Sequence, residues 1–134
     1  DTRALQAFRM MDFARVSGVA VLEEDGSLLS VLSAKDLRLV ASAESNRVNF
    51  EDLLLTAREF ITKAHEPEHI GRKVKLEDSI TLHPLASACH ESATLGRVIH
   101  KLHASKTHRI FVVDNMSKPT GCIALRDVLL ALIK

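Results

Sequence analysis

The feature that most constrains the fold is an internal repeat with a spacing of 91 residues. From Thr2 the chain runs through a helix-like stretch, an apolar strand, a polar turn, a second apolar strand and an amphipathic segment, and from Ala93 the same order returns without a gap. Three pairs of residues are identical at this offset: Val21 and Val112, Asp36 and Asp127, Leu39 and Leu130. Repeated units of this kind bury their apolar faces against each other. The repeat therefore predicts one module with two similar halves.

Each half opens with a helix that has one apolar face. The residues at helical spacing are Ala4, Ala7, Phe8 and Met11 in the first half and Leu95, Val98, Ile99 and Leu102 in the second. The runs GVAVLE, LLSVLS, IFVVD and GCIAL have the length of short strands, and AKDLRLV and RDVLLALI begin the closing helices. Four small or flexible apolar residues are expected to fill cores: Met10, Met11, Cys89 and Cys122.

A connector separates the two halves. We expect a first repeat over residues 1–42, a connector over 43–84 and a second repeat over 85–134. Within the connector one helix is predicted from Asn49 to just before Pro67, with Leu53, Ala57, Phe60 and Ile61 on one face, and a polar, turn-rich stretch follows. The run LASAC predicts a strand before the second repeat. The first repeat has no counterpart to it, as expected of a fragment or of a chain whose N-terminus was removed.

Composition excludes several classes of function. The 134 residues include 18 basic and 17 acidic side chains, so the net charge of +1 does not indicate binding to nucleic acid or to an anionic membrane. The chain has no Trp or Tyr to stack on bases, and no apolar run near the roughly 20 residues of a membrane span. Two cysteines in a domain of this size indicate no disulfide framework. We expect a cytoplasmic protein, with the nucleus as the alternative.

The stretches HRIFVVD and KPTGCIALRDVL resemble a CBS (cystathionine-β-synthase) domain, and SGVAVLEEDGSLLSVLSAKDL resembles its partner. The second copy is similar to those of the γ subunit of AMP-activated protein kinase. The resemblance implies an α+β fold in which two β-α-β-β-α repeats pack about a pseudo-twofold axis, an arrangement called a Bateman module. It also implies two clefts that bind adenosine nucleotides and regulate a kinase, another enzyme, a channel or a transporter.

The resemblance also implies which residues contact a nucleotide. Asp36 and Asp127 take the place of the aspartate that binds the ribose hydroxyls, and charge-assisted hydrogen bonds suit this role. Ser33 matches the hydroxyl residue that stands three positions before the aspartate, whereas Ala124 departs from that pattern. The closing helix of each repeat also has a simpler interpretation, because an aspartate in the first turn caps a helix.

The same resemblance assigns the phosphate and adenine contacts. His108 and Arg109 match the phosphate-binding pair, although they could instead cap the edge of the sheet. Their counterparts in the first repeat contribute only a hydroxyl. The remaining expected contacts are Ser17 and, for further phosphate contacts, Lys35 and Arg126, with Ala88, Cys89 and Leu32 beside the adenine of the Asp36 site. The Asp127 site would need a strand that precedes Asp1.

No catalytic or metal signature appears in the sequence. It has no glycine-rich phosphate loop and no paired-carboxylate pattern, so we expect no enzyme activity. His100 and His103 lie one turn apart, but two ligands make no closed zinc site, and we expect no metal. The expected ligands are AMP, ADP or ATP, ahead of S-adenosylmethionine. The expected partners are a kinase or the rest of a larger chain, and a second copy or another CBS module. The alternative is a ligand-free interaction scaffold.

Overall fold

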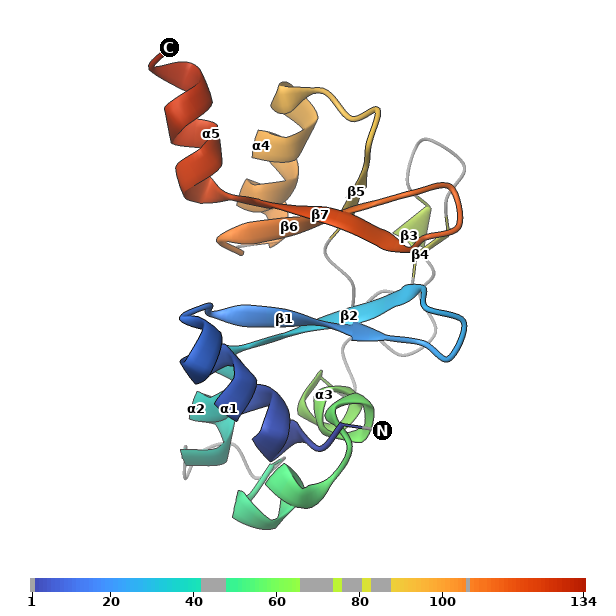
Figure 1. The fold of residues 1–134 in the computed structure, drawn as a ribbon, viewed down its shortest axis with the longest axis vertical. Helices are drawn as coiled ribbons and strands as arrows, with labels where there is room; N and C mark the ends of the chain where they lie inside the picture. The colour runs from blue at the N-terminus through green and yellow to red at the C-terminus, as the bar shows by residue number, and fades with distance from the viewer. Residues whose placement is uncertain (1, 42–47, 66–73, 76–80, 83–87, 106) are drawn as a thin grey trace.

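The computed structural model describes residues 2–41, 48–65, 74–75, 81–82, 88–105 and 107–134. The fold is α+β, as expected, and the sheets of its two halves, β1-β2 and β5-β6-β7, face each other with helices on their outer sides (Figure 1). Four elements of each half carry the repeat: α1 (Ala4–Ala14), β1 (Gly18–Leu22), β2 (Leu28–Ser33) and α2 (Ala34–Ala41), then α4 (Leu95–Ser105), β6 (Arg109–Val113), β7 (Pro119–Ala124) and α5 (Leu125–Leu132). All eight pairs of bounds differ by the 91-residue offset of the sequence, so the repeat is confirmed element by element.

The two sheets differ by one strand. In the first half β1 pairs antiparallel with β2, whereas in the second half β5 (Ala88–His90) pairs parallel with β6, and β6 pairs antiparallel with β7. In the described part of the chain β1 therefore has no partner on the side where β6 carries β5. Two short strands, β3 (Val74–Lys75) and β4 (Thr81–Leu82), pair antiparallel in the stretch that the sequence predicted as polar turns.

The predicted connector helix is wrong in one respect, because the structure divides it. A 3-10 helix, η1 (Phe50–Leu54), is followed by α3 (Ala57–His65). Asn49 caps η1 as predicted, its Oδ1 accepting from the Glu51 amide at 3.0 Å. Thr56 and Glu59 then cap α3 reciprocally, with the Thr56 amide 2.9 Å from Glu59 Oε2. The new cap and the extended backbone at residue 55 end the first helix and start the second.

Helix α3 belongs to the core of the first repeat. Phe60 and Ile61 are fully buried there, which confirms the predicted apolar face. The ring of Phe60 meets that of Phe8 edge to face, with centroids 5.7 Å apart. In the second half no described helix fills the equivalent place. Leu95 and Ile99, the counterparts of Ala4 and Phe8 on the predicted apolar face, are consequently 43% and 39% exposed.

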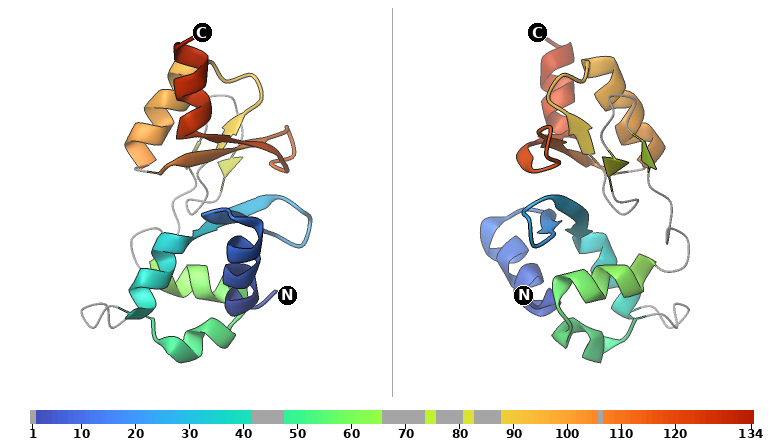
Figure 2. Two further views of the ribbon diagram at one scale, coloured as in Figure 1. Left: turned by 60° about the vertical axis from the view of Figure 1, so that its left-hand side comes forward. Right: turned by 90° about the vertical axis from the view of Figure 1, so that its right-hand side faces the viewer.

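A small apolar cluster joins the two sheets. Leu28 from one half packs with Ala88 and Val113 from the other, and Ala20 and Phe111 border them. The two views of Figure 2 also show the sheets facing each other. At one end the hairpin turns of the two halves meet, where the backbone amide of residue 28 donates to the carbonyl of residue 117 at 2.8 Å. The halves thus share an interface but keep separate cores behind each sheet.

Two of the expected core residues are exposed. Met11 and Cys89 are buried as expected, but Met10 is 57% exposed and Cys122 is exposed as well. Met10 lines a groove beside β1 instead of the core. Cys122 pairs across the sheet with Phe111 and so lies on the face that turns toward the other half, where it is not covered. Among the described residues, no helix is long and apolar enough to cross a membrane.

Candidate functional site

Arg109 connects the two repeats at the start of β6. Its Nη2 donates to Ser17 Oγ at 2.6 Å and its Nη1 donates to the Gly18 carbonyl oxygen at 3.3 Å. Gly18 is the counterpart of Arg109 at the 91-residue offset. Two counterparts of a twofold arrangement come into contact only near its axis. The guanidinium of Arg109 therefore lies near the axis that relates the two repeats.

The closing helices begin beside this arginine. The Ala34 amide at the start of α2 donates to the Ser17 carbonyl at 3.0 Å, and the Leu125 amide at the start of α5 donates to the His108 carbonyl at 2.8 Å. In the sheet of the second half, residue 109 lies opposite residue 124, the last residue before α5. The partial positive charges of two helix N-termini thus flank the guanidinium. This arrangement favours an anion.

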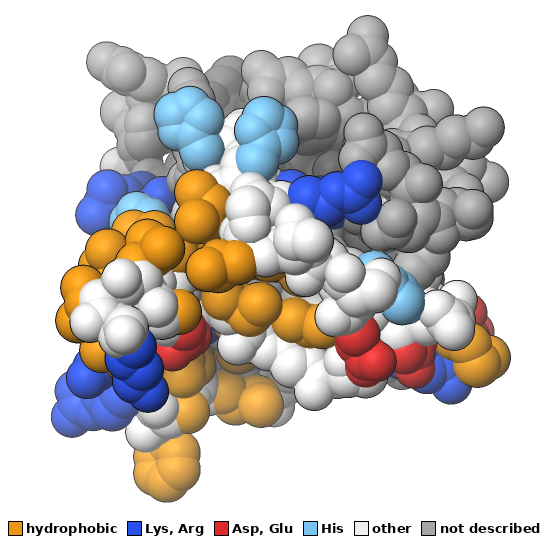
Figure 3. Space-filling view, turned by 90° about the horizontal axis from the view of Figure 1, so that it is seen from above, with side chains coloured by type: hydrophobic (Ala, Val, Ile, Leu, Met, Phe, Trp, Pro, Cys, Tyr) orange, Lys and Arg blue, Asp and Glu red, His pale blue; other side chains and the backbone are white. Residues whose placement is uncertain are grey.

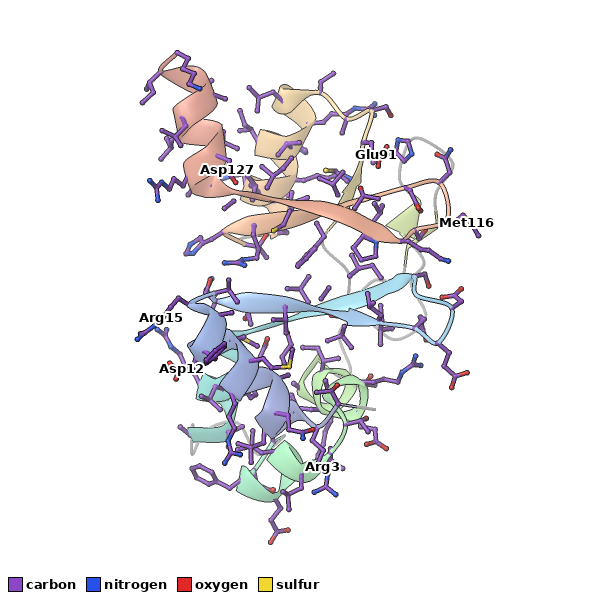
Figure 4. All side chains as sticks on the ribbon, viewed as in Figure 1. Arg3, Asp12, Arg15, Glu91, Met116 and Asp127 are labelled. Atoms are coloured by element: carbon purple, nitrogen blue, oxygen red, sulfur yellow. The ribbon has the colours of Figure 1, made fainter. Side chains whose placement is uncertain are left out.

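The two aspartates cap the helices that they open. Asp36 Oδ2 accepts from the Ser33 amide at 2.7 Å and from Ser33 Oγ at 3.0 Å, and the residue is only 6% exposed. Asp127 Oδ2 accepts from the Ala124 amide at 2.8 Å and the side chain is exposed at the start of α5 (Figure 4). Each carboxylate oxygen carries two lone pairs, so the cap bond at Asp127 leaves acceptor capacity there for a ligand hydroxyl. The Ala124 departure explains why only Asp36 gains a hydroxyl donor.

Two of the expected adenine contacts face away from the space between the sheets. Leu32 is fully buried in the core of the first repeat, and Cys89 is buried among the helices of the second. Side chains alternate along a strand, so these two point to the helix side of their sheets. The structure corrects the expectation for both side chains, and only their backbones can border the cleft. Ala88 packs in the cluster between the sheets.

The other expected phosphate contacts lie on the surface. His108, Lys35 and Arg126 are exposed, next to the starts of β6, α2 and α5 respectively. Sequence reasoning missed one neighbour of this group, Cys122. Desolvation raises the pKa of its thiol, while the guanidinium of Arg109 lowers that pKa and the carboxylate of Asp127 raises it. The position of Cys122 follows from the alternation of side chains along β7. Ile123 packs on the helix side of the sheet, so Cys122 lies on the opposite face, toward the first repeat.

A groove of about 420 Å³ lies elsewhere, along the open side of β1. Its walls are β1 with the two residues after it, α1 and the start of α3: Thr2, Ala7, Met10, Val19, Ala20, Val21, Leu22, Glu23, Glu24, Thr56, Ala57 and Arg58. In the second half, β5 runs beside the counterparts of residues 20–22. The groove is therefore the place that a third strand takes in the complete repeat, and it is separate from the Arg109 site.

The histidines show no metal centre. In the described part of the chain, no three His, Cys, Asp or Glu residues are close enough to hold a metal ion together. His100 and His103 are exposed on α4, as expected. His90 instead has hydrogen-bond partners, with Nδ1 at 2.8 Å from Ser92 Oγ and Nε2 at 2.6 Å from Asn115 Oδ1. His69 and His83 lie outside the described residues.

Comparison with known proteins identifies the repeat. Residues 79–134 match the family model described as the CBS domain. Residues 79–134, which include the whole second repeat, are thus a CBS domain. Together with the repeated elements and the solved structures below, this match makes the chain a tandem CBS pair.

Two curated relatives match nearly the whole CBS pair. The chain is 28% identical over 142 aligned residues to the SNF1-related protein kinase regulatory subunit gamma-1 of Arabidopsis thaliana, covering 99% of this chain and 30% of that protein. It is 26% identical over 129 residues to the 5'-AMP-activated protein kinase subunit gamma of Saccharomyces cerevisiae, covering 96% and 34%. The CBS pair thus spans about a third of the length of these relatives.

Solved structures share the fold. The CBS domain protein PAE2072 from Pyrobaculum aerophilum, complexed with AMP, superposes with a TM-score of 0.65 at 16% identity, covering 98% of this chain and 86% of that one. The CBS domain pair of protein MJ0100, in complex with 5'-methylthioadenosine and S-adenosyl-L-methionine, gives 0.63 at 12% identity, covering 100% and 86%. At these identities the likeness concerns the fold alone.

Proposed function

We propose that this CBS pair binds an adenine nucleotide between its repeats and acts as a non-catalytic regulatory module. The observation that carries the proposal is the position of Arg109, whose guanidinium reaches from the second repeat to the first between two helix N-termini. A planar cation in that place suits a phosphate group. Asp36 and Asp127 stand at the starts of the same helices, where a ribose would lie.

The relatives support the adenine part of the ligand. One structural neighbour was crystallised with AMP, and another with two adenosine derivatives. Both curated relatives are named as subunits of a protein kinase. We therefore propose AMP, ADP or ATP as the ligand, S-adenosylmethionine as the alternative, and a protein kinase as the partner whose activity the module regulates.

Isothermal titration with AMP, ADP, ATP and S-adenosylmethionine tests the binding. The matched variants are Asp36→Asn and Asp127→Asn, because the two residues are counterparts at the repeat offset and asparagine keeps an oxygen for the cap. Loss of the charge-assisted ribose bonds should weaken binding about 10- to 100-fold at the occupied cleft and leave the other variant near wild type. Equal affinities in all three proteins would show that neither aspartate binds the ribose.

An interaction scaffold is the second candidate, because apolar side chains gather on the outer helices of the second repeat. Figure 3 views this side of the molecule and shows hydrophobic side chains on its surface. The exposed ones from α4, α5 and the residue that follows are Leu95, Ile99, Leu125, Leu129, Leu130, Leu132 and Ile133. Light scattering after gel filtration tests this candidate. A stable dimer that dissociates on Leu129→Glu and Leu132→Glu, together with no response to any nucleotide, would favour the scaffold.

A further inference from the structure

Gly18 lies beside the stem of the arginine that crosses between the repeats. A Cβ at this position would lie 3.3 Å from the carbonyl oxygen of Leu32 and 3.5 Å from Cδ of Arg109. The second separation is an ordinary van der Waals contact, but the first is tight and involves backbone, which would have to shift by a few tenths of an ångström. Because the Gly18 carbonyl accepts from Arg109 Nη1, such a shift would move one of the two acceptors that hold the guanidinium.

The contacts with the first repeat use one edge of the guanidinium. Nη1 and Nη2, which form its end, donate to Gly18 O and Ser17 Oγ, and these are the hydrogen bonds of the Arg109 side chain within the described residues. The group has five N–H donors in a fixed plane. The side edge, made of Nε–H and the second N–H of Nη2, remains for an acceptor. That edge matches two oxygens of one phosphate group.

Ser17 is itself held in place by the helix that follows its repeat. Its carbonyl accepts from the Ala34 amide at 3.0 Å, at the start of α2. This bond fixes the backbone of Ser17, and its hydroxyl accepts from Arg109 Nη2 at 2.6 Å, which restrains a long side chain that would otherwise sample several rotamers. Fixing those rotamers before the ligand arrives lowers the entropy lost on binding.

We propose that Ser17 and Gly18 are positioning residues, which hold the guanidinium of Arg109 so that its side edge binds one phosphate of the nucleotide. The proposal rests on the proposed function and gives Ser17 a different role from the direct ligand contact that the sequence predicts. If Ser17 acts through Arg109, its removal matters only for ligands that carry a phosphate and only while Arg109 is present.

The experiment compares AMP with adenosine, which lacks the phosphate, by titration calorimetry. Wild type should bind AMP more tightly than adenosine, and Arg109→Met should remove most of this preference, about 10- to 100-fold. Ser17→Ala and Gly18→Ala should each weaken AMP about 3- to 10-fold and leave adenosine unchanged, whereas Ser17→Thr, which keeps the hydroxyl, should restore AMP binding. In an Arg109→Met background, Ser17→Ala should have no further effect.

Three results would overturn the proposal. If Ser17→Ala weakens AMP and adenosine equally, the residue shapes the cleft and does not position a phosphate ligand. If its effect persists in the Arg109→Met background, Ser17 contacts the nucleotide directly. If wild type binds neither ligand, the proposed function fails first and the proposal fails with it. In that case urea unfolding of the Ser17→Ala and Arg109→Met double-mutant cycle still shows whether the contact between the repeats forms.

Discussion

Replacing Phe60 with alanine tests whether the connector helix is part of the first repeat. Phe60 is fully buried, in edge-to-face contact with Phe8, in the core that also holds α1 and α2. Removing a buried phenylalanine costs about 3–5 kcal/mol of unfolding free energy, from lost burial and the cavity left behind. At about 2.1 cal/mol/K of unfolding entropy per residue, the 134 residues give about 0.28 kcal/mol/K. The midpoint of thermal unfolding should fall by about 11–18 °C.

Urea unfolding followed by circular dichroism measures the change, and Phe50→Ala is the matched control. Phe50 lies in the same segment but is 71% exposed, so its removal should cost less than about 0.5 kcal/mol. A Phe8→Leu and Phe60→Leu double-mutant cycle should give a coupling of about 0.5–1.5 kcal/mol for the aromatic pair. Equal, small effects at Phe60 and Phe50 would refute the placement of α3 in this core, and with it the support that α3 gives to the helices around the site.

Three further predictions concern pH, thiol reactivity and backbone strain. A hydrogen bond from Lys63 lowers the pKa of Asp52 in the folded protein. The stability that ionised Asp52 contributes is therefore complete above the unfolded pKa of about 4 and is lost as the pH falls through the lower folded pKa. In urea unfolding, the Lys63→Met variant should lose less stability between pH 5 and pH 2 than wild type does. The thiol of Cys122 should react with a maleimide in the native protein, and faster as the pH rises, because its raised pKa keeps it mostly protonated at neutral pH. The buried thiol of Cys89 should react only in urea. Two fast-reacting thiols at neutral pH would contradict the burial of Cys89. Ser117→Gly should raise the unfolding free energy by about 0.5–1 kcal/mol, because Ser117 has a left-handed φ of 61°. Its counterpart Gly26 has a φ of 85°, so Gly26→Ser should lower the unfolding free energy by a similar amount. No difference between the two variants would refute the left-handed turn at either position.

The repeat made most of the fold predictable from the sequence. One frame aligned the two copies, and hydrophobic spacing within that frame placed both opening helices and both hairpins. The division of the connector helix left one local signal, because Thr56 and Glu59 have the spacing of a capping box. Contacts distant in sequence also hold the break: the amide of Ala4 donates to the carbonyl of Leu55 at 2.9 Å, and Arg3 forms a bridge with Thr56. These contacts join residues 51 and 53 positions apart and leave no local pattern in the sequence.

The site was predictable in residue type but not in contact. The resemblance assigned phosphate contacts to Arg109 in the second repeat and to Ser17 in the first. It did not predict that they touch, because only the packing of the two repeats brings Arg109 Nη2 to 2.6 Å from Ser17 Oγ. The alternation of side chains along β2 and β5 shows which residues share a face with Leu32 and with Cys89. It does not show which face of each sheet packs against the helices. That choice depends on where α1 and α4 pack.

The constant 91-residue offset limits how the two hairpin turns can be engineered. The side chains of the two copies differ at most positions, yet their hairpin turns have the same length. The amide of Leu28 and the carbonyl of Ser117 join those turns directly, so a length change in one would pull it away from the other. A graft between the copies must therefore keep turn length, whereas it can change the side chains of the turn.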